Sequence, residues 1–247
     1  MDIGSINKLA EIIKSSKNTV FFGGAGVSTE SGMPDFRSEK GLYTAQKNYG
    51  ASPEELISNY CYRRNPELFF RYYKENLIHA DARPNAAHIA LAQLEARGLL
   101  NAVITQNIDG LHQAAGSKNV MELHGANDRH YCEKCKKKYD LKYALAGENV
   151  TKCESCGGTV RPDVVLYGES LDDNVMRSAI NSIGRADCLI IGGTSLVVYP
   201  AAGLIEYFGG SNLVLINKGE TTYDSRADLV INKSIGAVFN EVMKTIG

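Results

Sequence analysis

The chain has 247 residues, of which 44% are hydrophobic, so it can bury a full core in one large domain or in a large domain with a small insertion. Its 27 basic and 28 acidic residues give a net charge of −1 and are mixed along the sequence, which argues against a general nucleic-acid or membrane surface. No stretch reaches transmembrane length. We expect a cytoplasmic protein, or a nuclear one if its source has a nucleus.

Strands and helices are predicted to alternate along the chain. The first 18 residues form an amphipathic helix with no signal-peptide features. Further helices are expected within residues 40–82, with Pro53 and Pro66 near helix starts, and over 84–97 and 172–183. Strands are expected over 20–22, 100–105, 120–123, 188–191, 213–216 and 229–231. This alternation predicts an α/β fold with a doubly wound parallel sheet, whose ligand lies along the carboxyl ends of the strands.

The stretch VFFGGAGVSTESGMPDFRS, residues 20–38, joins the first strand to a glycine-rich turn. If Ser28, Thr29 or Glu30 opens a helix, the turn amides and the helix N-terminus form a phosphate site. The pattern by itself is incomplete, because Thr29 stands where the dinucleotide fingerprint has a third glycine. An ordinary strand-to-helix turn therefore remains an equal alternative at this point. The acid, aromatic and arginine of PDFRS favour a cofactor site.

Polar side chains follow several later strands, at 106–109, 124, 194–195 and 217. A lone histidine is more often a hydrogen-bonded structural residue than a catalytic one. His124, however, ends a strand beside a glycine and faces the predicted crevice, which favours a general base because its pKa lies near working pH.

Four of the six cysteines form two C-x-x-C knuckles, Cys132 with Cys135 and Cys153 with Cys156. Two disulfides would suit a secreted mini-protein, whereas four thiolates in a reducing compartment suit one tetrahedral Zn²⁺. A site closed by four cysteines leaves no position for a reactive water, so the zinc is expected to be structural. The remaining two, Cys61 and Cys188, are expected to be buried and inert.

Six segments, taken in order, resemble the sirtuins, the family of NAD-dependent protein deacylases. They are GAGVSTESGMPDFRS, TQNIDGLH, LHGA, the four-cysteine spacing, VVLYGE and GTSLVVYPAA. Because the match covers nearly the whole chain, it resembles a compact bacterial or archaeal member. The chain departs from the commoner pattern at Tyr167, where many members have phenylalanine. The resemblance implies a Rossmann-like NAD domain from residues 1–38, 81–127 and 163–247. It also implies a small domain made of a helical module, 39–80, and a zinc ribbon, 128–162.

The resemblance assigns most of the polar strand ends to NAD. In the cofactor site it places Gly24, Ala25, Gly26, Ser28 and Thr29 at the phosphates and the nicotinamide-side ribose, Phe36 over the anomeric carbon, and Arg37 against the cofactor. Gln106, Asn107, Ile108 and Asp109 would line the ribose and nicotinamide pocket, and Thr194, Ser195, Asn217 and the backbone near Ile235 would hold the adenosine half. His124 and Asn107 are the implied catalytic residues.

The implied substrate is an acyl-lysine peptide held as an extra strand between two segments. One wall contains Val164, Val165, Tyr167 and Gly168, and the other contains Val197 and Tyr199. In the implied reaction the acyl oxygen attacks the anomeric carbon of the NAD ribose as nicotinamide leaves, and His124 helps to deprotonate a ribose hydroxyl. The products would be free lysine and O-acyl-ADP-ribose. The oligomeric state is expected to be monomeric.

The resemblance also predicts which acyl groups are removed. Sirtuins that prefer succinyl or malonyl lysine carry a Tyr-x-x-Arg pair on the helix after an Asn-Pro, and counting from Asn65-Pro66 brings Tyr73 and Asn76 to these two places. Without the arginine a buried acyl carboxylate would lack a charged partner, so neutral acyl groups are expected. Arg71 or Lys74 could supply the charge if the helix is rotated from this count, and a second Tyr-x-x-Arg, Tyr60 to Arg63, comes too early.

Two other functions use the same motifs. Mono-ADP-ribosyl transfer to a protein would need the same NAD pocket, but the neutral peptide groove of VVLYGE argues against it. A noncatalytic NAD-sensing or peptide-binding module would not need His124, Asn107 and Asp109.

Overall fold

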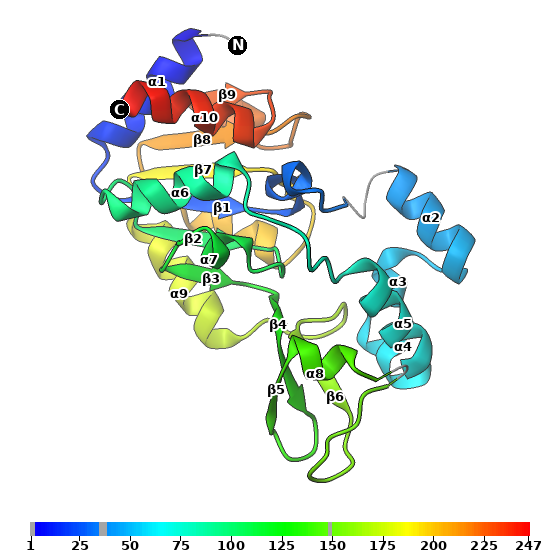
Figure 1. Cartoon of the computed structure of the whole chain (residues 1–247). Coiled ribbons are helices and arrows are strands. Elements are labelled where there is room, and N and C mark those ends of the chain that lie inside the picture. Colours follow the sequence, from blue (N-terminus) through cyan, green and yellow to red (C-terminus); the bar gives the residue numbers. More distant parts are fainter. Residues whose placement is uncertain (1–2, 35–38, 148–149) are drawn as a thin grey trace.

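A six-stranded parallel sheet forms the centre of the molecule (Figure 1). The structure, a computed structural model, describes residues 3–34, 39–147 and 150–247, with the side chains of 39–42 outside this description. The sheet order is β3-β2-β1-β7-β8-β9. Its strands are β1 (Thr19–Gly23), β2 (Ala102–Thr105), β3 (Val120–Glu122), β7 (Cys188–Gly192), β8 (Asn212–Ile216) and β9 (Leu229–Ile231), close to the six predicted ranges.

Helices cover both faces of this sheet. One face packs against α1 (Ile3–Ser15), α6 (Ala86–Ala96) and α10 (Ile235–Ile246), and the other against α9 (Asp173–Arg185) and a 3₁₀ helix, Ala201–Tyr207. Successive residues of β1 alternate between the two cores, with Phe21 in the first and Val20 and Phe22 in the second. Burial on both faces explains why the strands read as continuous apolar runs in the sequence.

The strand order reverses between β1 and β7, where the chain leaves the sheet in opposite directions. The glycine-rich turns that follow these two strands meet here, and the Gly26 amide donates to the Gly193 carbonyl over 2.8 Å. A Cβ atom on Gly26 would lie 2.7 Å from the Gly193 Cα, so both turns require glycine. No α-helix begins at Ser28, Thr29 or Glu30, so the condition for a phosphate site at an α-helix N-terminus is not met. The first turn continues as two 3₁₀ turns, Ala25–Val27 and Thr29–Ser31.

Four helices between β1 and β2 form a separate layer, at the right of Figure 1. They are α2 (Glu39–Tyr49), α3 (Pro53–Leu56), α4 (Asn59–Arg64) and α5 (Pro66–Asn76), and both prolines occupy first helical positions as predicted. Several aromatic side chains form the core of this layer, including Phe69, Tyr72 and Tyr73. Tyr43 and Tyr60 do not, since they are 68% and 74% exposed.

A second sheet of three antiparallel strands lies below the main sheet in Figure 1, where the zinc ribbon was predicted, although its individual strands were not. It pairs β4 (Gly125–Cys132) with β5 (Lys138–Asp140) and β6 (Val160–Val164), and α8 (Leu141–Leu145) follows β5. The polar sequence of β4, GANDRHYC, lacks an apolar run that would have indicated a strand. The short helix α7 (Leu111–Ala114) was also missed.

The two unpaired cysteines differ in burial. Cys188 is buried in β7, and burial raises the pKa of its thiol to about 11, as expected for an inert group. Cys61 on α4 is only half-buried, so the prediction of a buried thiol was wrong there. None of the described helices has the length and apolar character needed to span a membrane.

Candidate active site and metal centre

A cavity of about 270 Å³ lies where the carboxyl ends of β1, β2 and β3 face the helical layer and the segment after β6. The strand ends contribute Ala25, Ser28, His124 and residues 106–109 to its lining. The segment after β6 contributes Val165, Tyr167 and Gly168, next to Val164 at the end of that strand. Residues from distant parts of the sequence, predicted to share one crevice, therefore line one cavity.

His124 is held in one orientation at the end of β3. Its Nδ1 lies 2.8 Å from the Gln106 carbonyl oxygen, and a carbonyl can only accept a hydrogen bond. In the neutral ring the proton is therefore on Nδ1, and Nε2 carries the lone pair. This tautomer is the one that a general base at Nε2 requires.

A partly buried network of hydrogen bonds fixes other polar groups that line the cavity with His124. The Ser28 hydroxyl donates to Asp109 Oδ2 over 2.7 Å and accepts from Asn107 Nδ2 over 3.0 Å. The other oxygen of Asp109 accepts the Leu111 amide over 2.9 Å. Ser28 is only 2% exposed, so its hydroxyl orients the Asn107 amide and the Asp109 carboxylate inside the cavity wall.

Two histidines that the sequence analysis did not single out lie behind Ser28. His88 Nδ1 accepts the Asn85 amide over 3.3 Å, which places its proton on Nε2, 3.5 Å from the Ser28 hydroxyl. His112 packs against it at a ring-centroid distance of 4.7 Å. Burial lowers the pKa of His88, and burial together with His88 lowers the pKa of His112 to about 3, so both rings are neutral. The Asn85–His88 spacing, which caps α6, was the available signal.

The residues predicted for the adenosine half gather at the ends of β7 and β8. Thr194 receives a hydrogen bond at its hydroxyl from Gln106 Nε2 over 3.1 Å and one at its carbonyl from Asn217 Nδ2 over 2.8 Å. Ser195 is exposed beside it. These contacts connect the ends of β7 and β8 to Gln106, which lines the cavity.

The turn after β1 is tied to the start of α10. The Gly236 amide donates to Glu30 Oε2 over 2.7 Å, which brings Ile235 near the turn that contains Thr29. The Thr29 hydroxyl itself donates to the Gly26 carbonyl over 3.0 Å. Phe36 and Arg37, the other predicted cofactor contacts, lie outside the described residues.

Two segments predicted to hold a peptide expose large apolar side chains. Tyr167 is 38% exposed after β6, and Val197 and Tyr199 after β7 are 59% and 68% exposed. The first segment is fixed from behind, because the Val165 amide donates to the His124 carbonyl over 2.9 Å and the Tyr167 amide to the Ile57 carbonyl over 3.1 Å. Tyr199 and Tyr167 both line the cavity.

The helical layer supplies a part of the lining that the sequence analysis missed: Pro53, Glu54, Ile57 and Leu77. The positions expected to mark the acyl end do not belong to the lining. Tyr73 is buried with its hydroxyl 3.1 Å from His130 Nε2. Asn76 donates to the Tyr49 hydroxyl over 2.6 Å. No lysine or arginine of the described residues lines the cavity.

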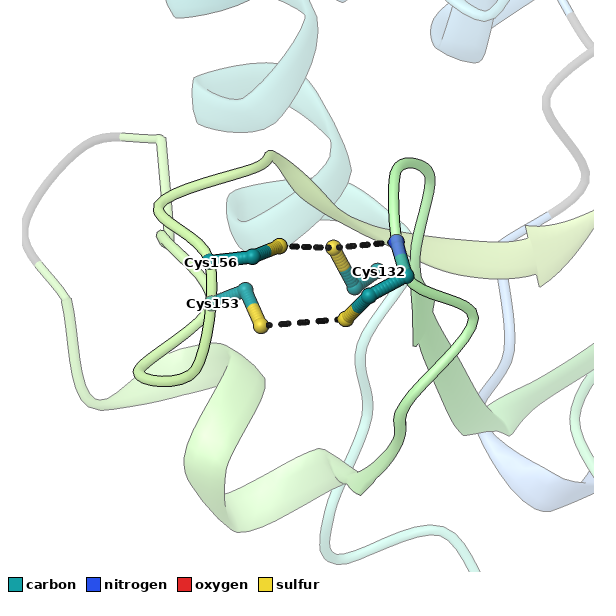
Figure 2. A group of neighbouring side chains, drawn as sticks. Cys132, Cys153 and Cys156 are labelled. Carbon is teal, nitrogen blue, oxygen red and sulfur yellow. Dashed lines mark hydrogen bonds between the residues drawn. The ribbon is translucent and has the colours of Figure 1, made fainter.

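The four cysteines of the two knuckles come together at one point (Figure 2). Their Sγ atoms all lie within 4.8 Å of one another, with Cys132 to Cys156 at 3.5 Å and Cys135 to Cys153 at 3.6 Å. All four are free thiols, which excludes the disulfide alternative. Zn–S bonds of about 2.3 Å in a tetrahedron place sulfur atoms about 3.8 Å apart, so this cluster suits one Zn²⁺.

Neighbouring groups complete the metal centre. The Tyr139 hydroxyl donates to Cys153 Sγ over 3.0 Å, and such outer contacts orient thiolate ligands. A Cβ atom on Gly158 would lie 2.8 Å from Cys132 Sγ, so the second knuckle needs glycine to approach the first. With all four thiolates as ligands, no coordination position would remain for a reactive water, which is the arrangement of a structural site.

The fold and the site define a Rossmann-like α/β nucleotide-binding protein with a cavity at the carboxyl ends of its parallel strands and a four-cysteine cluster that suits a structural metal. The sequence profile of the Sir2 family matches residues 24–200, and the chain belongs to this family. It is 63% identical to an NAD-dependent protein deacetylase of Clostridium perfringens, with 96% of this chain and 98% of the relative covered. It is 55% identical to an NAD-dependent protein deacetylase of Clostridium acetobutylicum, with coverage of 98% and 99%.

Solved structures of the family superpose closely. A Sir2 protein with a p53 peptide and NAD⁺ is 40% identical and has a TM-score of 0.86, with 96% of each chain covered. A Sir2 complex with a deacetylated p53 peptide and 3'-O-acetyl ADP ribose is also 40% identical, with a TM-score of 0.88 and 97% of each chain covered.

Proposed function

We infer that this sirtuin is an NAD-dependent protein lysine deacetylase, and we propose roles for the residues of its cavity. The observation that carries the proposal is the position of His124. Its ring is fixed with the lone pair on Nε2, and it lines one cavity with Asn107, Asp109 and the exposed wall at Tyr167. Transfer of an acyl group from lysine to a nucleotide requires a base that lies next to both a nucleotide crevice and a peptide groove.

The nucleotide part of the cavity matches NAD in its chemistry. Gly24, Gly26 and Gly193 have no side chains, which lets the two turns approach each other closely at the switch point. Parallel sheets bind dinucleotides at such a point. Bound NAD supplies a ribose whose anomeric carbon accepts the acyl oxygen as nicotinamide leaves. We assign Asp109 to the nicotinamide carboxamide, because its carboxylate lines the cavity and the Ser28 hydroxyl and Leu111 amide hold it in place while leaving a lone pair on each oxygen for a further donor.

Asn107 and His124 act on the reacting sugar. The Asn107 amide is oriented by Ser28 to hydrogen-bond ribose or an ordered water. His124 Nε2 takes a proton from a ribose hydroxyl, and the Gln106 carbonyl stabilises the resulting imidazolium at Nδ1. We further assign Ala25 and Thr29 to the phosphates and Thr194, Ser195, Asn217 and Ile235 to the adenosine half. From the sequence alone we assign Phe36 to the anomeric carbon and Arg37 to a contact with the cofactor.

The substrate is an acyl-lysine peptide that lies between residues 164–168 and 197–199. Main-chain pairing to such walls makes affinity depend weakly on side chains, which predicts broad sequence tolerance. The acyl chain is expected to enter the cavity, whose lining includes Ile57, Leu77 and the carboxylates of Glu54 and Glu169 but no lysine or arginine among the described residues. A negatively charged acyl group would be unpaired there, so acetyl, propionyl and butyryl groups are preferred.

The chain is proposed to divide as the sequence suggests, into residues 1–38, 81–127 and 163–247 around the large sheet, and 39–80 with 128–162 beside it. Hydrophobic clusters distinct from those of the large sheet, in the helical layer and around the cysteines, support this division, and the first of them also includes Val164 and Leu166 from the adjoining segment. A cytoplasmic location and a monomeric state remain predictions from the sequence.

One experiment tests the function. The protein is incubated with an acetyl-lysine peptide, with and without NAD, and the products are identified by mass spectrometry. Deacetylated peptide, nicotinamide and O-acetyl-ADP-ribose in equal amounts are expected only with NAD. ADP-ribose attached to the peptide, with the acetyl group retained, would indicate the alternative ADP-ribosyltransferase instead.

A further inference from the structure

An ion pair anchors the proposed peptide wall, and its Glu169 also lines the cavity, with 21% of its side chain exposed. Arg161 on β6 is 5% exposed, and its two terminal nitrogens donate to the two oxygens of Glu169 over 2.9 and 3.0 Å. The second of these nitrogens also donates to the Val164 carbonyl over 3.0 Å. Such a bidentate pair sets distance and angle together. Lysine could not reproduce it, because an ammonium is a point charge.

Glu169 also forms hydrogen bonds with the backbone of the wall. Its Oε2 accepts the Leu166 amide over 3.0 Å, and its own amide donates to the Leu166 carbonyl over 2.9 Å. The segment from Val164 to Glu169 is therefore closed into a compact loop, with Gly168 in the left-handed region at φ 86°. Burial acts to raise the pKa of Glu169, but hydrogen bonds from Arg161, Leu166 and Asn59 outweigh it and keep the carboxyl ionised.

The same pair also connects the wall to the helical layer. Asn59 at the start of α4 donates from Nδ2 to Glu169 Oε1 over 2.6 Å, and its backbone amide donates to the Tyr167 carbonyl over 2.9 Å. The Arg161 guanidinium lies over the Tyr62 ring of α4, 5.0 Å from its centroid. Three parts of the chain thus meet at one charge pair: β6, the wall, and α4.

We propose that Arg161 and Glu169 are positioning residues that hold the 164–168 wall in its peptide-binding shape and so determine peptide affinity. Neither residue touches the reacting atoms in this assignment. The NAD side, at Gly26, Asp109 and Thr194, receives no contact from either side chain in the described structure, so NAD affinity is independent of the pair. This inference rests on the proposed function, because it takes the wall as the peptide site.

The test uses the full chain with zinc bound and compares Glu169→Gln and Arg161→Lys with wild type. Glu169→Gln keeps the shape of the side chain but removes its charge. Arg161→Lys keeps the charge but removes the two guanidinium nitrogens that make the bidentate pair. The control is Glu241→Gln, which breaks an exposed pair with Lys244 on α10. We expect the peptide KM to rise about tenfold or more in both test variants, with kcat at saturating peptide and the KM for NAD within about twofold of wild type.

Hydrogen–deuterium exchange of free enzyme gives a second readout, because the Leu166 amide should exchange at least about tenfold faster in Glu169→Gln than in the control. An unchanged peptide KM in both variants overturns the proposal, and so does a parallel loss of NAD affinity. If the single variants unfold, the double variant Arg161→Met with Glu169→Gln places two uncharged side chains at this site and has no bidentate pair. Its peptide KM should then be about tenfold or more above wild type, and an unchanged KM overturns the proposal. A wild-type enzyme that deacetylates no peptide contradicts the proposed function itself, which separates the two failures.

Discussion

The neutral, buried His112 predicts a specific loss of stability at acid pH. Its ring is 1% exposed, and neither nitrogen has a hydrogen-bond partner within the described structure. Folding therefore holds it neutral, with a pKa lowered from 6.5 to about 3. The unfolded chain binds a proton below about pH 6.5 that the folded chain does not. The stability contributed by neutral His112 is full above pH 6.5 and is lost as the pH falls toward 3.

The magnitude follows from the two pKa values. A pH of 5.0 is about 1.5 units below the pKa of the histidine in the unfolded chain, and each unit corresponds to about 1.4 kcal/mol. The free energy of unfolding should thus be about 2 kcal/mol lower at pH 5.0 than at pH 7.5 from this residue alone. Burial also lowers the pKa of His88, and lowers that of His130 to about 4, so these residues add to the pH dependence and a matched variant is needed.

His112→Phe provides the comparison, because phenylalanine fills a similar volume against Phe21 and cannot be protonated. Urea unfolding is followed by circular dichroism at both pH values for wild type and variant, with zinc content checked at each. The drop from pH 7.5 to 5.0 should be about 2 kcal/mol smaller in the variant. Equal drops in the two proteins would show that His112 is solvated or hydrogen-bonded in solution, and the reasoning from burial would be refuted.

Three further predictions concern the site. His124→Ala should lower kcat about 10² to 10⁴-fold while calorimetry still detects NAD binding, because the cofactor is held by other residues; near wild-type turnover would exclude the general base. Freshly purified protein should contain about one zinc per chain, and Cys132→Ala should lose zinc, solubility and activity together; a fully active variant without metal would contradict a structural role. With one peptide sequence, kcat/KM should be higher for acetyl than for succinyl lysine, since the described lining offers no cation; a succinyl preference would refute this reading.

Local patterns in the sequence were sufficient to predict the features that depend on residues close together in the chain. Apolar runs marked the six strands of the main sheet, and the prolines at 53 and 66 marked helix starts. The spacing of Cys132, Cys135, Cys153 and Cys156 predicted one closed metal site, because four thiolates at two short intervals can reach a single ion. The sirtuin motifs predicted the family, which the comparisons confirmed.

Features that depend on contacts between distant segments needed the tertiary structure. The glycine turn continues as 3₁₀ turns because it packs against a second turn at Gly193, more than 160 residues away in the chain, and no local pattern reports that contact. Likewise, the tautomer of His124 is set by the Gln106 carbonyl, and Ser28 acquires its partners only when β1 and β2 pair.

The helical layer shows the same limit from the other direction. Counting along α5 placed Tyr73 and Asn76 at the acyl end of the cavity, but helix rotation about its axis is decided by packing, which turns Tyr73 toward His130 and Asn76 toward Tyr49. Arg161 and Glu169 are only 8 residues apart in the sequence, yet their pairing between β6 and α4 appears only in three dimensions. The sequence by itself determined which residue types are available for chemistry, and tertiary packing decided which of them face the ligand, because side-chain direction and burial depend on neighbours that are remote along the chain.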